Sequence, residues 1–184
     1  DLPPMGLKFT RYFDSTPMSH HHITRHGLWH KAVASYLATA SFTDHCVGRL
    51  LDALDDRAHA DNTIVVLWSD HGFHIAETMH WEKRSLWEES TRDPLNLSVP
   101  GNSTKQSAVS SRPVGLIDIY PTLVELCHLP PKTDLQGRSL VPLLKNPQLP
   151  WNYPVLTTHH PGNHAVRSEH CRYIRYDNGD EELY

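Results

Sequence analysis

A carboxylate and an imidazole stand side by side in Ser69-Asp70-His71-Gly72, and Lys83 follows in the next loop. An aspartate offers hard oxygen to a divalent cation, and a neutral histidine offers either a nitrogen ligand or a donor to a bound oxyanion. Lysine adds a compact positive charge that suits a tetrahedral anion. These residue types at this spacing predict half of a metal site that hydrolyses an anionic ester.

The element that must position the pair is the apolar run Thr63–Trp68, which follows polar Asp61-Asn62 directly. Its composition is typical of a buried strand in a parallel sheet. Open α/β sheets bind their ligands at the carboxyl ends of such strands. We therefore expect Asp70 and His71 to lie at a sheet edge that faces a ligand.

Further elements surround this strand. Apolar residues at three- and four-residue steps predict one helix over Thr24–Leu54, and Gly48 within it favours close packing against a neighbour. Pro94–Val99 is a second strand candidate. Asp118 is a plausible N-cap for a helix over Ile119–Leu126. The pattern indicates an α/β unit.

The two ends of the chain differ from this unit. Residues 1–23 lack a sustained period and are expected to form a surface loop, and Pro142–Pro154 is expected to be a proline-rich linker. Short alternating runs follow over Val155–Thr158, Ala165–Arg167 and Arg172–Tyr176. They predict a small antiparallel sheet appended to the α/β unit, with domain boundaries at 1–145 and 146–184.

Composition narrows the class of protein. A chain of 184 residues with a net charge of −4 lacks the basic surface of a nucleic-acid-binding protein. No apolar run approaches the roughly 20 residues of a membrane-spanning helix. Three distant cysteines form neither a disulfide framework nor a zinc motif.

The site motif and its surroundings resemble the sulfatases of the alkaline-phosphatase superfamily, most closely the branch similar to iduronate-2-sulfatase. In that family an apolar strand ends in Ser-Asp-His-Gly, and a Trp-x-Lys follows, here Trp81-Glu82-Lys83. Other segments resemble the family as well: Tyr36–Asp44, Val47–Leu54, Trp87–Leu95, Asp118–Leu123, Gly137–Leu140, His164–Arg167 and Tyr173–Tyr176. The resemblance implies an alkaline-phosphatase-like α/β sandwich, followed by the start of a small antiparallel C-terminal subdomain.

The resemblance also implies roles for particular residues. Asp70 and His71 would be metal ligands for Ca²⁺, and Lys83 and His71 would contact the sulfate as catalytic residues. His80, His164 and Arg167 are expected to bind substrate. His80 could equally be a packing histidine, and Arg167 could equally form a structural ion pair. Because the loop 73–79 departs from the family pattern, the role of His74 stays open.

The family nucleophile motif, Cys-x-Pro/Ala-x-Arg, is absent from this sequence. Cys46-Val47-Gly48-Arg49 has the wrong spacing and lies in the predicted helix. The resemblance therefore implies a C-terminal portion of a calcium-dependent sulfatase acting on a carbohydrate sulfate ester. The N-terminal half of the same enzyme would be its partner and would supply the formylglycine, so this chain alone is expected to be inactive. Family members are periplasmic, extracellular or lysosomal.

Two other functions and two local features remain open. The chain could be a non-catalytic glycan-binding module, or part of a phosphodiesterase or phosphonate hydrolase of the same superfamily. His26 and His30 could share a helix face as zinc ligands, although a solvent-facing run is favoured. Asp93 and Asn96 stand where the family strand is apolar, and burial there would be costly.

Overall fold

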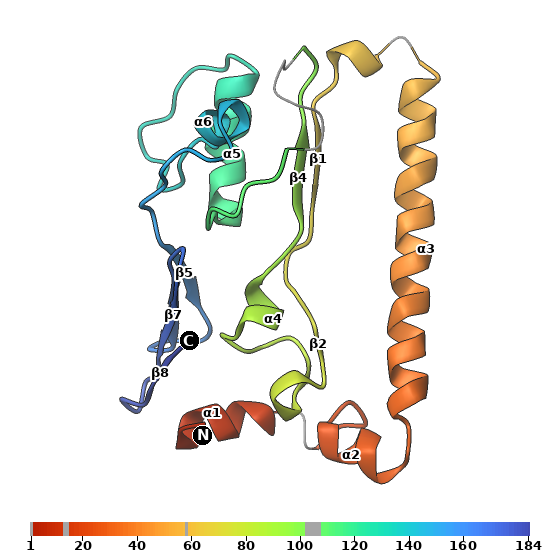
Figure 1. Ribbon diagram of the computed structural model, residues 1–184, viewed down its shortest axis with the longest axis vertical. Coiled ribbons are helices and arrows are strands. Elements are labelled where there is room, and N and C mark those ends of the chain that lie inside the picture. Colours follow the sequence, from red (N-terminus) through yellow and green to blue (C-terminus); the bar gives the residue numbers. More distant parts are fainter. Residues whose placement is uncertain (1, 13–14, 58, 102–107) are drawn as a thin grey trace. The chain divides into compact units, whose positions relative to one another are not determined.

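The computed structural model describes residues 2–12, 15–57, 59–101 and 108–184. The chain forms two compact units, Leu2–Asn102 and Ser103–Tyr184, which we call the site unit and the sheet unit (Figure 1). In the described part of the chain, none of the helices combines the length and the apolar character needed to cross a lipid bilayer.

Two short helices open the site unit, so the prediction of a surface loop over residues 1–23 is wrong. Helix α1 covers Pro4–Thr10 and α2 covers His20–Arg25. A proline at the first helical position favours α1, since its missing N–H would have no partner there. Ser19 caps α2 by accepting a hydrogen bond of 3.0 Å from the backbone N–H of His22.

The single helix predicted over Thr24–Leu54 is in fact two. Gly27 takes a φ of +64° between α2 and α3 (Trp29–Asp55), and this left-handed residue ends the first helix. No described residue of α3 is buried, and a Cβ on Gly48 would meet nothing within 4 Å. The predicted close packing of Gly48 is therefore wrong, because no described residue lies against this position.

Strand β1 (Val65–Trp68) ends just before the motif, as predicted, but its pairing differs. Among the described residues it pairs only with β4 (Leu95–Ser98), antiparallel, with Trp68 opposite Leu95. The side chains of Leu67 and Trp68 are 42% and 50% exposed. A buried parallel strand was therefore the wrong expectation here, since burial and parallel pairing both need further strands.

The remaining elements of the site unit are short. They are η1 (Ala60–Asn62), β2 (His74–Ile75), η2 (Glu77–Met79), β3 (Trp81–Glu82) and α4 (Glu88–Thr91). Strands β2 and β3 pair antiparallel, with His74 opposite Glu82. The most buried apolar side chains of this unit lie in or next to these elements: Trp81, Leu86 and Trp87 are at most 3% exposed.

The sheet unit begins with η3 (Leu116–Asp118) and α5 (Ile119–Leu126), which has the predicted bounds. Asp118 stands at the N-cap position, but its side chain does not cap the helix. Its two carboxylate oxygens instead accept the backbone N–H groups of Gly115 and Arg138, at 2.9 and 2.7 Å. Helix α6 (Val141–Lys145) occupies the start of the predicted linker.

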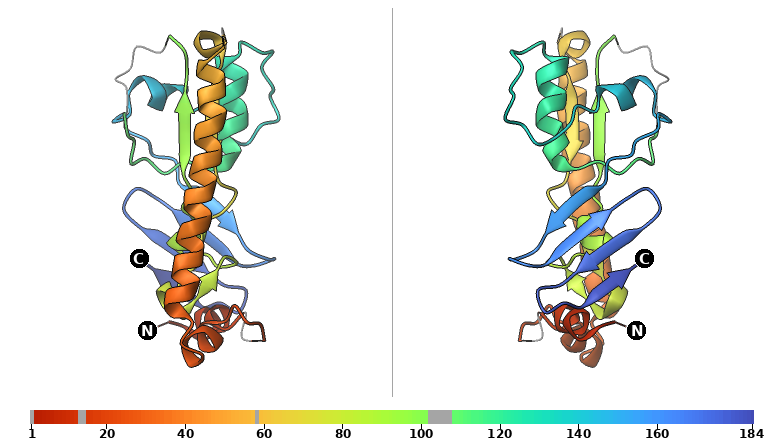
Figure 2. Two further views of the ribbon diagram at one scale, coloured as in Figure 1. Left: turned by 90° about the vertical axis from the view of Figure 1, so that its right-hand side faces the viewer. Right: turned by 90° about the vertical axis from the view of Figure 1, so that its left-hand side faces the viewer.

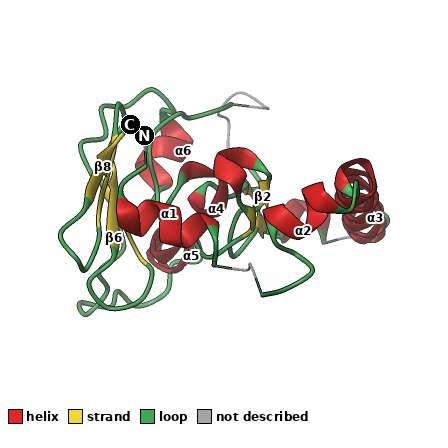
Figure 3. Ribbon diagram, turned by 90° about the horizontal axis from the view of Figure 1, so that it is seen from below, coloured by secondary structure: helices red, strands yellow, loops and turns green. Residues whose placement is uncertain are grey.

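Four antiparallel strands complete the sheet unit, in the order β5 (Val155–Thr158), β6 (His164–Arg167), β7 (Arg172–Arg175) and β8 (Glu181–Leu183). Figure 2 shows them as blue arrows, and Figure 3 separates helices from strands by colour. The small antiparallel sheet at the C-terminus is thus confirmed, and with it the α/β class. Its core includes Ala165, Ile174 and Tyr176, each at most 2% exposed.

Candidate functional site

The site unit brings Asp70, His71 and Lys83 together, as the sequence motif predicts. The Nζ of Lys83 lies 2.5 Å from Nε2 of His71, and Oδ1 of Asp70 lies 3.6 Å from the same nitrogen. The side chain of Asp70 is 83% exposed and that of His71 is 31% exposed. A carboxylate, an imidazole and an ammonium therefore converge on a point that solvent reaches.

Hydrogen bonding fixes the tautomer of His71. Its Nδ1 lies 2.7 Å from the carbonyl oxygen of Gly72, and a carbonyl oxygen can only accept, so Nδ1 carries the proton. Nε2 then holds a lone pair, which accepts a hydrogen bond from the Lys83 ammonium. Fixing one ring nitrogen in this way leaves the other directed at a cation.

Gly72 ties the motif to α4. Its backbone N–H donates to the carbonyl of Ser90 at 2.9 Å. A Cβ on Gly72 would lie 1.9 Å from the carbonyl oxygen of Glu89, well inside van der Waals contact. Only glycine allows this approach, and the approach sets where the neighbouring His71 lies.

The segment that carries Lys83 has an unusual backbone. Five residues other than glycine have a positive φ between 55° and 84°: Ala76, Thr78, Met79, Glu82 and Arg84. Two of them flank Lys83 directly. Each such residue costs of order 1–2 kcal/mol, so the surrounding contacts must hold the segment in this conformation.

Two buried histidines help to keep the segment around Lys83 in this conformation. His74 and His80 are 0% and 1% exposed, and their rings meet edge to face at 4.8 Å. Nε2 of His74 donates to Oγ of Ser85 at 2.9 Å, because the Ser85 hydroxyl itself donates to Ser90. Nε2 of His80 donates to the carbonyl of Lys83 at 2.8 Å. This placement favours the packing alternative for His80 over a substrate contact.

Burial, followed by the neighbouring His80, lowers the pKa of His74 from 6.5 to about 4. The unfolded chain therefore binds one more proton than the folded chain between these two pH values. We expect the contribution of His74 to stability to be constant above pH 6.5 and to fall below it, by up to about 1.4 kcal/mol per pH unit, until it levels off below about pH 4. Urea denaturation between pH 7.5 and pH 4 measures this slope. The His74→Gln variant, which keeps a donor for Ser85, should lack it; an unchanged slope in that variant would contradict the assignment to His74.

Asp93 is a site neighbour that sequence reasoning treated only as an anomaly. Continuing the β1–β4 register beyond Trp68–Leu95 places it opposite Asp70. Its Oδ1 is buried without a hydrogen-bond partner among the described residues, and this burial raises the pKa of its carboxyl, as does the nearby Asp70 carboxylate. Asn96, in contrast, is exposed. Strand register, rather than motif spacing, is the signal that would have located Asp93.

The other two predicted substrate contacts lie in the sheet unit. His164 and Arg167 are the first and last residues of β6, three positions apart, so they project from opposite faces of the sheet. Nδ1 of His164 lies 2.9 Å from Oγ1 of Thr158, and the Arg167 guanidinium donates to the carbonyls of Ser168 and Cys171. The structure does not bring these two side chains together, and their contact with a substrate stays a prediction.

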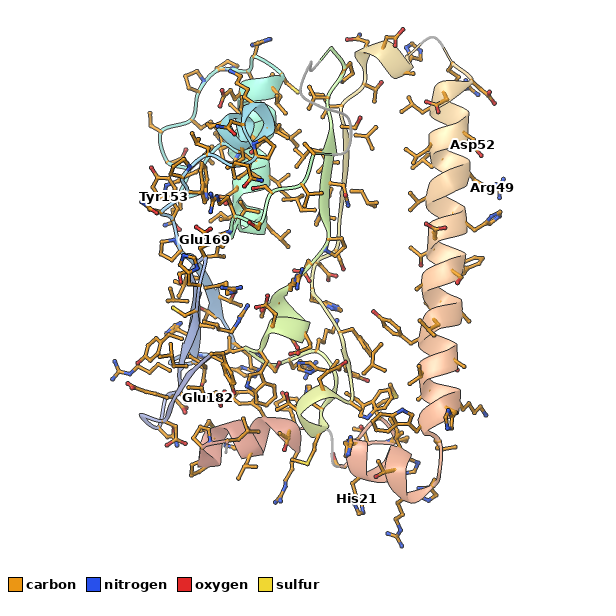
Figure 4. All side chains as sticks on the ribbon, viewed as in Figure 1. His21, Arg49, Asp52, Tyr153, Glu169 and Glu182 are labelled. Carbon is orange, nitrogen blue, oxygen red and sulfur yellow. The ribbon has the colours of Figure 1, made fainter. Side chains whose placement is uncertain are left out.

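The remaining candidates are exposed. His26 and His30 are exposed, as is His21 (Figure 4). Cys46 lies on α3, where Arg49 is labelled, as an ordinary exposed helical residue. Within residues 2–12, 15–57, 59–101 and 108–184, no group of three or more His, Cys, Asp or Glu residues could hold a metal ion. The zinc alternative therefore has no support from these residues.

Comparison with known proteins assigns this chain to a family. A sequence model of the Sulfatase family matches residues 7–129. The chain is 41% identical to a Sulfatase of Formosa agariphila over its whole length, which is 36% of that relative. It is 34% identical to an N-acetylglucosamine-6-O-sulfatase of Bacteroides thetaiotaomicron, a match that covers 72% of the chain and 24% of the relative.

A solved structure of a protein in complex with its substrate D-glucosamine-2-N,6-O-disulfate shares the fold. Its TM-score is 0.73 at 30% identity, covering 81% of this chain and 33% of the other. Fold and site together define part of an α/β protein of the alkaline-phosphatase superfamily. Within that superfamily, the chain belongs to the sulfatase family. It spans between about a quarter and just over a third of the length of these relatives.

Proposed function

We propose that the polypeptide containing this chain is a calcium-dependent sulfatase that hydrolyses sulfate esters of carbohydrates. The observation that carries this proposal is the convergence of Asp70, His71 and Lys83 at the end of β1. A sulfate ester is a tetrahedral anion, and an ammonium held beside an imidazole offers it positive charge and hydrogen-bond donors.

The donor set fits part of a cation site. Asp70 presents an exposed carboxylate, and the tautomer of His71 leaves Nε2 unprotonated. Ca²⁺ takes six to eight ligands, mainly oxygens, so residues outside this set would complete its shell. When bound, the ion would polarise the ester oxygens. Because Lys83 donates to the same Nε2, we expect its ammonium to turn toward the substrate when a cation takes that nitrogen.

The formylglycine nucleophile belongs to the same proposal, and we place it in the N-terminal half of the native enzyme. The sulfated sugars named for two of the relatives favour a sulfated amino sugar as the substrate. Assignment to the iduronate-2-sulfatase-like branch is a finer proposal, since the matching family model covers sulfatases in general.

The test is sulfate release by the purified native polypeptide. The substrates are glucosamine 6-sulfate, glucosamine 2-N-sulfate and a uronic acid 2-sulfate, with a phosphate monoester and a phosphonate monoester as competing chemistries. We expect sulfate release that EGTA abolishes and Ca²⁺ restores, with no turnover by residues 1–184 alone. Faster hydrolysis of the phosphorus esters, or sulfate release by residues 1–184 alone, would overturn the proposal.

A further inference from the structure

The backbone of Lys83 is held by a hydrogen bond from a buried side chain. His80 is 1% exposed, and its Nε2 lies 2.8 Å from the carbonyl oxygen of Lys83. A carbonyl cannot donate, so the Nε2–H of His80 donates. A hydrogen bond shielded in part from water gains strength, and its loss would leave the Lys83 carbonyl without this donor.

This bond acts where the chain is least able to hold its own conformation. Glu82 and Arg84, on either side of Lys83, have φ values of +70° and +71°. Side chains disfavour this region, so without an external hold the backbone would relax and rotate the lysine side chain away. The direction of Lys83 therefore depends on contacts made by its neighbours.

The rest of the cluster explains why His80 itself does not move. Its ring packs edge to face on His74 and on Trp87, with ring centroids 4.8 and 5.9 Å away. His74 is anchored by its hydrogen bond to Ser85, which donates in turn to Ser90. Backbone N–H of Gly72, next to His71, donates to the carbonyl of the same Ser90. One buried network thus reaches both the loop of His71 and the loop of Lys83.

We propose that His80 is a positioning residue for Lys83: its Nε2–H holds the Lys83 carbonyl so that the ammonium meets Nε2 of His71. This inference rests on the proposed function, in which Lys83 contacts the sulfate. It differs from the substrate contact expected from the sequence, because His80 acts through the backbone of another residue and touches no substrate itself.

Two substitutions separate the donor from the ring. His80→Phe keeps an aromatic ring and removes the donor, whereas His80→Gln removes the ring and keeps an N–H donor at a similar distance from the backbone. Since small misplacements of reacting groups can cost about 10²-fold in rate, we expect His80→Phe to lower kcat/KM for sulfate release by about 10- to 100-fold in the native polypeptide. His80→Gln should restore most of that loss. Leu86→Ala, at a 1% exposed neighbour, serves as the control for lost stability alone.

A double-mutant cycle tests whether the effect passes through Lys83. In a Lys83→Met background, His80→Phe should cost nothing further, because the group it positions is gone. Equal losses in both backgrounds, or a loss matched by Leu86→Ala at the same melting temperature, would overturn the inference.

A measurement independent of activity distinguishes this inference from the proposed function. The rate at which acetic anhydride acetylates Lys83 is measured by mass spectrometry of the native polypeptide. This rate should rise in His80→Phe and stay low in His80→Gln. If Lys83→Met leaves sulfate release unchanged, the role of Lys83 in the proposed function fails, and the acetylation rates still decide the inference. Equal acetylation rates in all three proteins would contradict it.

Discussion

Replacing Lys83 by methionine should lower kcat/KM for sulfate release by about 10²–10³-fold, the range seen when one preorganised donor to a developing oxyanion is removed. Methionine has a similar length and no charge, so the change removes the ammonium that lies 2.5 Å from Nε2 of His71. The fold should persist, because the hydrogen bond from buried His80 is accepted by the backbone carbonyl of Lys83 and not by its side chain.

The measurement is steady-state sulfate release by the native polypeptide, together with its melting temperature. Lys31→Met is the matched control, since Lys31 is an exposed lysine of α3 in the same unit. Lys83→Arg should recover only part of the rate, because a planar guanidinium does not reproduce the compact charge of an ammonium. A Lys83→Met enzyme as fast as the Lys31→Met control would remove Lys83 from the site.

Gly72→Ala should destabilise the folded protein by about 3 kcal/mol, the upper part of the range for overpacked sites. The new Cβ would lie 1.9 Å from the Glu89 carbonyl oxygen and 2.9 Å from its carbon. Both are backbone atoms, so no side-chain rotation can relieve the clash. Because Gly72 follows His71 directly, the same shift should also reduce sulfate release.

Chemical denaturation of the native polypeptide measures this loss, and Gly48→Ala supplies an opposite control. Gly48 lies within α3, where a Cβ would meet nothing within 4 Å. Alanine there should stabilise the helix by about 0.5–1 kcal/mol. If both substitutions changed the free energy of unfolding equally, the close approach of Gly72 to Glu89 would not explain why a side chain is excluded there.

Local patterns predicted the elements that local interactions stabilise. The helix Ile119–Leu126 and the antiparallel strands from Val155 onward form largely where the sequence places them. Their periodicity, turn residues and proline position act over a few residues. The motif also predicted that Asp70, His71 and Lys83 would meet, which the structure confirms as a geometry.

Features set by distant contacts were missed. The approach of Gly72 to Glu89 and the burial of His74 depend on residues that no periodicity links, whereas a packing role for His80 was one of two alternatives. Pairing of β1 with β4 reversed the expected strand direction, because an apolar run does not specify its partner. The break at Gly27 needed a backbone angle that the sequence leaves open.

Under the proposed function, the left-handed residues around Lys83 would separate the control of substrate recognition from contact with substrate. Glu82 and Arg84 flank Lys83 and differ in side chain, yet both adopt a positive φ, so each would direct the lysine by its backbone angle. Drift or directed evolution at such positions, toward glycine or away from it, would re-aim the ammonium while leaving every group that meets the ester unchanged. If Lys83 contacts the ester as proposed, new selectivity would arise in residues that a survey of ligand contacts would pass over.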